Sequence, residues 1–427
     1  MKKIIIQFNE ANFDLITRYA DNYNLKSLKK ITTLASKGNT SSEDEYQNLE
    51  PWIQWYSFYS NKKFSDHKVF HLNDYKDKNQ KIFLDELIEK DKKIGVFGSM
   101  NLPPNNKFNI YIPDPWSTVK TDSSLSSRSV NYALKYLVNN NAKLRINLRS
   151  LFGLFFIFGF PSLKKISILF KILLHFIKKD RSKLVAYFDY LFLDYSLRRI
   201  KKKKLDFSLI FLNGFAHIQH HYLLNSKFIT KKKENPEWYI SRYKDPIYDS
   251  LLVYNQMFET YFKKYPNYET WIITGLSQEP ENYPKIYWRF NNHKKIFDNF
   301  FKFDYEIFPH MTRDFEIKVN DKKNLEFVIN FLNHSSIRVL KNNQIHKAFG
   351  FINNNSSNSV FSSFVYNDEF SELELNFRNT NVNLNQRDLN FVAIKNSIHN
   401  QQGWVYTNVN KKDLSNIKIW DLSRLIV

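Results

Sequence analysis

Apolar and polar positions follow two alternating patterns along much of the chain. Residues 3–8 form a short run of β-branched and apolar side chains, and after Asn9 and Glu10 a pattern of helical period extends over 13–34. Similar segments return later, with helical patterns at 83–90 and 248–265 and apolar runs at 93–98, 207–212 and 270–274. Strands that alternate with helices predict the α/β class, a mainly parallel sheet flanked by helices.

The loops that follow the strands are where functional side chains are expected. Open parallel sheets place their sites beyond the carboxyl ends of the strands. In this chain those loops begin at Asn9, Gly98, Asn213 and Gly275.

The middle of the chain, 129–204, changes to a long helical pattern that is also basic. Its apolar run at 151–160 is too short to span a bilayer. The next apolar positions lie among lysines: Ile166, Leu169, Phe170, Leu173 and Ile177, with Lys164, Lys165, Lys171, Lys178 and Lys179. Two interpretations stay open, namely a basic amphipathic helix on an anionic membrane surface and a helical subdomain packed against the sheet.

These patterns divide the chain into five parts around one α/β domain. The polar, Asn-rich residues from 293 to 359 predict a peripheral or cap region. The predicted parts are 1–128 and 205–292 of the α/β domain, the helical, basic insertion 129–204, the small cap 293–385, and the C-terminal part 386–427 of the α/β domain.

Composition narrows the function classes. The absence of cysteine excludes disulfides, thiolate metal ligands and a cysteine nucleophile. A formal charge of +21 predicts attraction to anionic partners, but no nucleic-acid module accompanies it, so nucleic acid is not predicted as a partner. The N-terminal apolar run ends after three residues at Gln7, which is unlike a signal peptide, and the cytoplasm is the expected compartment.

The order of several short segments is informative. They are 5–11, 50–61, 93–99, 109–115, 209–221, 271–278 and 399–403, with 417–425 as the closing segment. In this order they resemble the type I phosphodiesterase and nucleotide pyrophosphatase branch of the alkaline phosphatase superfamily. The resemblance implies an alkaline phosphatase-like fold with two metal ions, commonly zinc, beside a Thr or Ser nucleophile.

The resemblance assigns the first metal ion to three positions. Where the family has a strand, an Asp, three residues and a His, this chain has Asn213 and His217, and His399 corresponds to a late histidine of the family. A shifted register, ranked second, would use Ala216 and His220. The histidines are good ligands, whereas an uncharged amide is a weak one.

The positions implied for the second ion are poorly suited to metal. They are Asn9, where the family has the Asp of an Asp-Gly pair, with Pro51, Leu276 and Ser277. Only Asn9 and Ser277 carry side-chain ligand atoms, and Pro51 lacks the hydroxyl that the family uses for attack. The usual two-metal site and covalent mechanism are therefore not expected.

A rebuilt site is one hypothesis for the remaining polar residues. Glu10 and Glu50 adjoin the replaced positions, and with His217 and His399 they could hold one divalent metal, zinc or manganese, or act without metal as acid and base. We predict Glu10 and Glu50 as catalytic, as general base or nucleophile, with His220 as a further metal ligand. The alternative is that both carboxylates are loop or helix-start charges, which the helix dipole favours.

Four residues are predicted to contact substrate because they adjoin these loops. They are Trp52, Gln54, Trp55 and Asn101. Aromatic rings beside a site can stack on sugar or base faces, although core packing is their commoner role.

Three functions follow as hypotheses. The first is a hydrolase or group transferase acting on an anionic small molecule or glycan, a phosphate or sulfate ester of cell-envelope polysaccharide metabolism. On this hypothesis Glu10→Gln and His217→Ala each abolish turnover. The second is a pseudoenzyme, an inactive module that binds a ligand or partner, and the third is a scaffold in peripheral contact with an anionic membrane.

Overall fold

The chain folds into two compact units. The computed structural model describes residues 2–45, 49–77, 80–139, 147–159, 163–177, 181–230, 233–310, 312–356, 358–411 and 413–427. The sheet unit comprises 1–230, 237–281 and 397–427, and the inserted unit comprises 231–236 and 282–396. The sequence placed the cap at 293–385, within the inserted unit.

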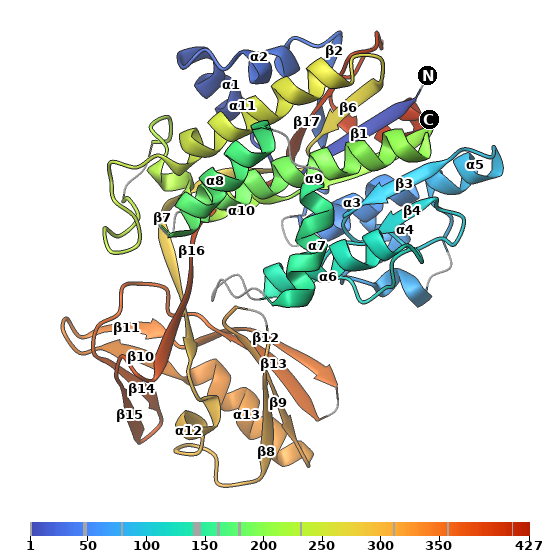
Figure 1. Cartoon of the computed structure of the whole chain (residues 1–427). Coiled ribbons are helices and arrows are strands. Elements are labelled where there is room, and N and C mark those ends of the chain that lie inside the picture. Colours follow the sequence, from blue (N-terminus) through green and yellow to red (C-terminus); the bar gives the residue numbers. More distant parts are fainter. Residues whose placement is uncertain are drawn as a thin grey trace. The chain divides into compact units, whose positions relative to one another are not determined.

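One eight-stranded sheet organises the sheet unit, in the order β18-β2-β17-β6-β1-β5-β3-β4 (Figure 1). The strands are β1 (Lys3–Phe8), β2 (Ser36–Ser41), β3 (Ile94–Phe97), β4 (Ile110–Ile112), β5 (Phe207–Leu212), β6 (Glu269–Ile273), β17 (Gln402–Thr407) and β18 (Ile417–Lys418). β1 runs parallel to both β5 and β6, whereas β17 runs antiparallel to β6 and β2. The predicted α/β class with a mainly parallel sheet is confirmed.

Helices cover both faces of this sheet (Figure 1). Along β1 the side chains alternate, so that Ile4, Ile6 and Phe8 join one core cluster and Ile5 joins the other. The helices of the sheet unit are α1 (Phe13–Asn22), α2 (Lys26–Thr32), α3 (Pro51–Ser60), α4 (Phe64–His67), η2 (Asp74–Asp77), α5 (Phe83–Glu89), α6 (Leu125–Asn139), α7 (Leu148–Phe158), α8 (Leu163–Ile177), α9 (Arg181–Lys203), α10 (Gly214–Tyr222), η3 (Leu223–Asn225), α11 (Pro246–Lys264) and α14 (Leu422–Ile426).

The single helix predicted over 13–34 is wrong, because the chain forms α1 and α2 instead. The break lies at Asn24, whose φ of 51° is in the left-handed region. Asparagine tolerates this conformation better than most residues, and it ends the first helix. The apolar period continues across the break because both helices contribute side chains to the same core cluster.

Four helices, α6 to α9, occupy the segment predicted as a helical insertion. Ile157 of α7, Ile168 of α8 and much of α9 are buried in the core cluster on one face of the sheet. The predicted features at 160–161 and 178–179 lie outside the described residues. Within the described part of the chain, every helix is too short or too polar to cross a bilayer.

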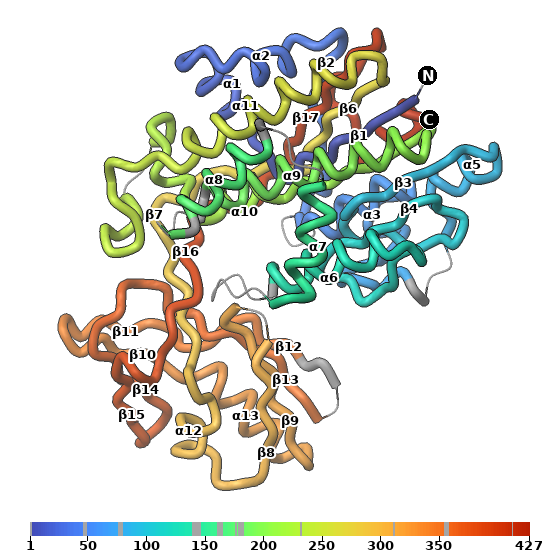
Figure 2. Tube along the Cα trace, in the orientation of Figure 1, coloured from blue at the N-terminus to red at the C-terminus, as the bar shows by residue number. Residues whose placement is uncertain are grey.

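The inserted unit is built on two four-stranded sheets, β11-β10-β14-β15 and β12-β13-β9-β8. Its elements are β8 (Tyr305–Pro309), β9 (Asp314–Val319), β10 (Ser336–Val339), β11 (Gln344–Lys347), β12 (Phe349–Ser356), β13 (Ser359–Phe364), β14 (Leu373–Phe377), β15 (Thr380–Leu384), α12 (His293–Phe297) and α13 (Lys322–His334). The chain leaves the sheet unit along β7 (Ser277–Phe290) and returns along β16 (Leu389–Asn400), two strands that pair with each other (Figure 2). We call this pair the stem.

Candidate metal centre

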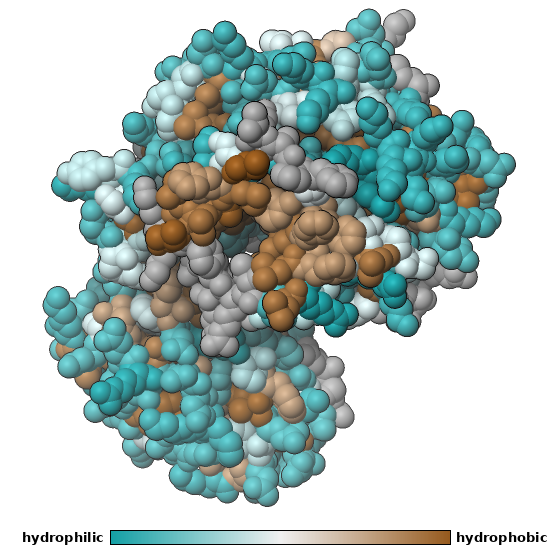
Figure 3. Space-filling view, viewed as in Figure 1, coloured by the Kyte–Doolittle hydropathy of each residue, from teal (hydrophilic) through white to brown (hydrophobic). Residues whose placement is uncertain are grey.

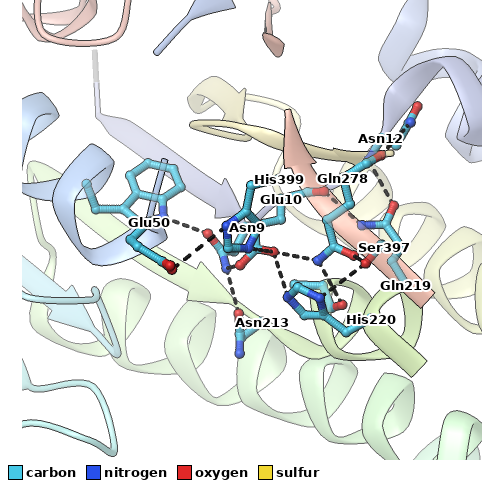
Figure 4. A network of polar contacts seen from close by, with 12 residues as sticks. Asn9, Glu10, Asn12, Glu50, Asn213, Gln219, His220, Gln278, Ser397 and His399 are labelled. Atoms are coloured by element: carbon cyan, nitrogen blue, oxygen red, sulfur yellow. Dashed lines mark hydrogen bonds and ion pairs between the residues drawn. The ribbon is translucent and has the colours of Figure 1, made fainter. Parts of the chain in front are cut away.

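Three side chains from distant parts of the sequence meet at the carboxyl end of β1 (Figure 4). Glu10 follows β1, His220 lies on the helix that follows β5, and His399 lies on the stem strand β16. Glu10 Oε2 is 3.0 Å from His220 Nε2 and 3.3 Å from His399 Nε2. One ligand atom from each residue lies within 4.8 Å of the other two.

The backbone fixes Glu10 in an unusual conformation. Its φ is 53°, in the left-handed region that costs a residue with a side chain roughly 1 kcal/mol or more. Its N–H donates to Thr274 O at 3.2 Å, and the N–H of Asn9 donates to Leu212 O at 3.0 Å, so neighbouring strands hold both residues. The resembled family has glycine here, and this chain accepts the strain while placing a carboxylate at the edge of the sheet.

Glu10 does not serve the start of the next helix, which was its alternative role. That helix, α1, is capped by Asn12, whose side chain accepts a hydrogen bond from Leu15 N. Glu10 is buried, and its two carboxylate oxygens accept hydrogen bonds from Asn9 Nδ2 and Gln278 Nε2. Its carboxylate therefore belongs to the cluster with the two histidines.

The hydrogen bonds around Gln278 determine the tautomer of His220. Gln278 Nε2 donates to both Glu10 Oε2 and Ala216 O, so Gln278 Oε1 is the end that accepts, from Ser397 Oγ at 2.6 Å. Because the single hydroxyl proton of Ser397 is donated there, Ser397 Oγ can only accept from His220 Nδ1, 3.2 Å away.

His220 Nδ1 therefore carries a proton, and its Nε2 faces the carboxylate of Glu10. A neutral imidazole of this tautomer would turn a lone pair toward a negatively charged oxygen. The contact is favourable when Nε2 is also protonated or when a cation lies between the two atoms. The geometry thus calls for positive charge at the centre of the cluster.

Both ring nitrogens of His399 face carboxylates. Its Nε2 faces Glu10, and its Nδ1 lies 3.8 Å from Glu50 Oε2. Glu50 precedes α3 without capping it, and its side chain is 36% exposed. The distance to Glu50 is that of an ion pair and is longer than a hydrogen bond. It nevertheless places a carboxylate behind the ring, where metal-bound histidines commonly have one.

Burial and charge act on Glu10 in opposite directions. Burial alone would raise the pKa of Glu10, but the positive charges of His220 and His399 and their hydrogen bonds bring it well below the usual value for glutamate. The carboxyl group is therefore ionised, and it supplies the negative charge of the cluster.

Asn9 and Asn213, predicted as metal ligands, contact each other instead. Asn9 Nδ2 donates to Asn213 Oδ1 at 2.7 Å, and Asn9 Oδ1 accepts from Trp55 Nε1 at 2.7 Å. Of the other positions implied for a second ion, Pro51 and Leu276 are buried without side-chain ligand atoms, and Ser277 is buried with only a hydroxyl. This donor set does not fit a two-metal site.

His217, the preferred ligand from sequence, is not in the cluster. It lies one turn before His221 on α10, and the two ring centroids are 4.5 Å apart. It lines a cavity of about 240 Å³ whose wall is largely apolar and includes Asn213, Trp116 and Phe192. The structure thus brings His220, the ligand of the second-ranked register, to Glu10 and His399.

Three of the four residues predicted to contact substrate are buried and form hydrogen bonds to other parts of the protein. Trp55 is buried and donates to Asn9, and the buried Gln54 accepts from Glu43 N at 3.3 Å. The side chain of Asn101 accepts from Asn73 N and donates to the carbonyl of Trp52, so it organises loops. Trp52 is partly exposed, and its indole N–H donates to a backbone carbonyl at 2.8 Å.

Sequence reasoning missed three supporting residues, Gln278, Ser397 and Gln219. Gln219 Nε2 donates to the carbonyl of Glu10 at 2.8 Å, and its Oε1 accepts from Asn12 N at 3.0 Å. These are common amides and a hydroxyl outside any motif. The one available signal was position, since Gln278 follows Gly275 in a strand-end loop and Gln219 lies beside His220.

A buried carboxylate beside the cavity makes stability depend on pH. Asp189 Oδ2 accepts from Gly214 N at 2.8 Å and from the hydroxyl of Tyr254 at 2.7 Å. Burial raises the pKa of Asp189 from 3.8 to about 7, although these hydrogen bonds act in the opposite direction. Between about pH 4 and 7 the folded state therefore holds a proton that the unfolded state has lost.

We expect Asp189 to reduce stability as pH rises through that window, by up to about 1.4 kcal/mol per pH unit, with the loss complete above about pH 7. Urea unfolding of the wild type and of Asp189→Asn at pH 5 and pH 8 measures the effect. The wild type should lose stability relative to the variant at pH 8. A difference that stays constant with pH would contradict the assignment.

Comparisons with known proteins concern the fold. No protein-family model and no curated protein match the chain. Among solved structures, phosphonoacetate hydrolase from Sinorhizobium meliloti 1021 with phosphonoformate is similar over 99% of this chain and 94% of its own, at 10% identity and a TM-score of 0.45. Murine ectonucleotide pyrophosphatase/phosphodiesterase 5 covers 100% and 94% at 7% identity and a TM-score of 0.41. The human counterpart covers 100% and 94% at 10% identity and 0.37.

Proposed function

We propose that the chain is a divergent member of the alkaline phosphatase superfamily, a hydrolase or group transferase for an anionic ester with one divalent cation. The observation that carries the proposal is the meeting of Glu10, His220 and His399 at the edge of the sheet. Two imidazoles and a carboxylate are the protein ligands of known catalytic zinc sites, which leave a position open to water or substrate. Zinc or manganese is the expected metal.

The geometry of the donors fits one ion. Ligand atoms of a tetrahedral site with bonds of about 2.0–2.1 Å are roughly 3.3 Å apart. The carboxylate oxygen of Glu10 lies 3.0 and 3.3 Å from the two histidine nitrogens. A cation between Glu10 and His220 would also accept the lone pair of His220 Nε2, which points toward the carboxylate of Glu10. When bound, it would polarise the ester and stabilise charge on its oxygens.

Glu10 and Glu50 have different surroundings, so we assign them different roles. Glu10 is buried with both oxygens engaged, so we assign it as a ligand rather than as the base that sequence suggested. Glu50 is partly exposed beside His399 and can take a proton from water. In hydrolysis the water oxygen bonds to phosphorus or sulfur while the bond to the ester oxygen breaks. Glu50 takes the proton released by water, and the leaving oxygen gains a proton from the solvent.

We further propose a phosphorylated or sulfated glycan of envelope polysaccharide metabolism as substrate. The net charge of +21 favours anionic ligands, and the partly exposed Trp52 lies two residues from Glu50, where its ring could meet a sugar face. Assays of phosphorylated and sulfated sugars beside nucleotide esters would test this choice. Turnover restricted to nucleotide esters would reject it.

The experiment for the proposed function is metal analysis of protein purified without chelator, with calorimetric titration of zinc and manganese and an assay on nitrophenyl phosphate esters. We expect one equivalent of metal and metal-dependent turnover. Glu50→Gln should keep the metal with affinity lowered about 10- to 100-fold, because the ligand His399 stays. Its turnover should fall about 10²- to 10⁴-fold, the usual contribution of a general base.

Glu279→Gln is the matched control, since Glu279 accepts from Asn400 at 2.8 Å outside the cluster. It should bind metal and turn over as the wild type does. Wild-type protein with neither metal nor esterase activity would reject the proposed function.

A second candidate function, an inactive module that binds an anionic ligand or partner, has its own observation in favour. Pro51 occupies the position implied for the nucleophile, and the neutral pair Asn9 and Asn213 occupies positions implied for metal ligands. Calorimetric binding of inorganic phosphate or a sulfated sugar by metal-free protein, without turnover of any ester tested, would favour this candidate.

A further inference from the structure

Large apolar side chains are exposed on two consecutive helices of the sheet unit, α7 and α8. Figure 3 shows them gathered over this part of the surface. We call these residues the apolar face: Leu148, Leu151, Phe152 and Phe155 of α7, with Ile166, Phe170, Leu173, Leu174 and Ile177 of α8. A contiguous exposed apolar patch marks an interaction site more often than an isolated apolar residue does.

The spacing of the exposed apolar residues on α8 shows that they form one continuous face of the helix. On α8 the exposed positions Ile166, Phe170, Leu173 and Ile177 recur at intervals of four, three and four, the period of one helix face. Ile168 of the same helix is buried in the core of the sheet unit. The helix is therefore anchored by one side, and its exposed apolar side contributes nothing to that anchoring.

The charge of the surrounding segment indicates what covers the apolar face. From 123 to 179 the sequence contains ten Lys and Arg residues and no Asp or Glu. Arg149 of α7 and Lys171 of α8 are exposed among the apolar residues. Lys165 of this segment pairs with Asp194 at 2.8 Å, so among the described side chains the exposed charges of α7 and α8 are Arg149 and Lys171. A second copy of the chain would bring these like charges together, which is unfavourable, whereas an anionic surface neutralises them.

We propose that the apolar face and its basic residues insert shallowly into the surface of a bilayer that contains anionic phospholipid. Apolar side chains enter the boundary between headgroups and acyl chains, and lysine and arginine meet the anionic headgroups. The described helices do not span a bilayer, so the contact is peripheral. This inference does not depend on the proposed esterase activity.

The test is flotation of the full chain with vesicles of phosphatidylcholine, with and without phosphatidylglycerol, at low and high salt. We expect binding to the anionic vesicles at low salt and weaker binding at high salt. Phe155→Ser combined with Phe170→Ser should weaken binding at least about 100-fold, because two aromatic side chains no longer enter the bilayer. Lys171→Glu should also weaken binding to the anionic vesicles.

The control replaces two large exposed aromatic residues outside these helices, Trp238→Ser with Tyr243→Ser, and should bind as the wild type does. Circular dichroism should show that all variants keep the fold, since each replaced side chain is exposed. The proposal is overturned by absence of wild-type binding at low salt, or by equal losses in the control and the Phe variants. It is also overturned if the Phe variants abolish self-association in sedimentation while vesicle binding is unchanged.

Discussion

Glu10→Gln is expected to remove the bound metal, with affinity at least about 100-fold weaker, and to reduce turnover to background. Supporting residues outside the ligand set typically change metal affinity 10- to 100-fold, and a charged ligand should count for more. The change is nearly isosteric, but an amide nitrogen would face one of the donors Asn9 Nδ2 and Gln278 Nε2. We therefore also expect a loss of about 1–3 kcal/mol in the free energy of unfolding.

Calorimetric titration of zinc and manganese, with urea unfolding of the same samples, measures both effects. Glu279→Gln serves again as the control, because it removes a carboxylate from the same stem without touching the cluster. Unchanged metal affinity in folded Glu10→Gln protein would show that Glu10 is not a ligand.

Alanine at His220 and at His217 should have opposite consequences. His220 presents Nε2 to Glu10, so His220→Ala should lose metal binding and turnover to the same extent as Glu10→Gln. His217 contacts His221 and lines the adjoining cavity, so His217→Ala should keep one equivalent of metal at near wild-type affinity. The sequence alone had expected the loss at His217.

The two histidines make a matched pair, since they share one helix and lie three residues apart. Metal titration followed by competition with a chelator gives the affinity of each variant. A loss of metal in His217→Ala with retention in His220→Ala would restore the register that the resemblance preferred.

The buried core of the fold was predictable because short apolar runs in this chain are strands. β1 and β5 have the predicted bounds, 3–8 and 207–212, since nearly all of their residues are apolar or lie between apolar neighbours. β2 has the sequence SKGNTS, which contains no apolar run and so gave no strand signal. It is a strand because it pairs with β17 and β18 on either side through backbone hydrogen bonds. The stem strands, which among the described strands pair only with each other, were also missed.

The candidate site was predictable at Glu10, Glu50 and His399, which lie beside positions that the resemblance marks. The choice between His217 and His220 depends on the rotation of α10 about its axis. Packing sets that rotation, with Phe215, Ile218 and Gln219 buried. A single sequence does not state which of these two histidines then faces the sheet edge. The ranking of registers favoured His217, whereas the cluster contains His220.

The stem has a consequence for how such a protein can diversify. Gln278 lies near the start of β7 and His399 near the end of β16, and both belong to the sheet unit, while the residues between 282 and 396 form the inserted unit. The chain thus enters and leaves the inserted unit along two paired strands, and the end of β16 that belongs to the sheet unit carries His399 of the cluster. A different module could replace the inserted unit by recombination, and Glu10, His220 and His399 would be inherited unchanged.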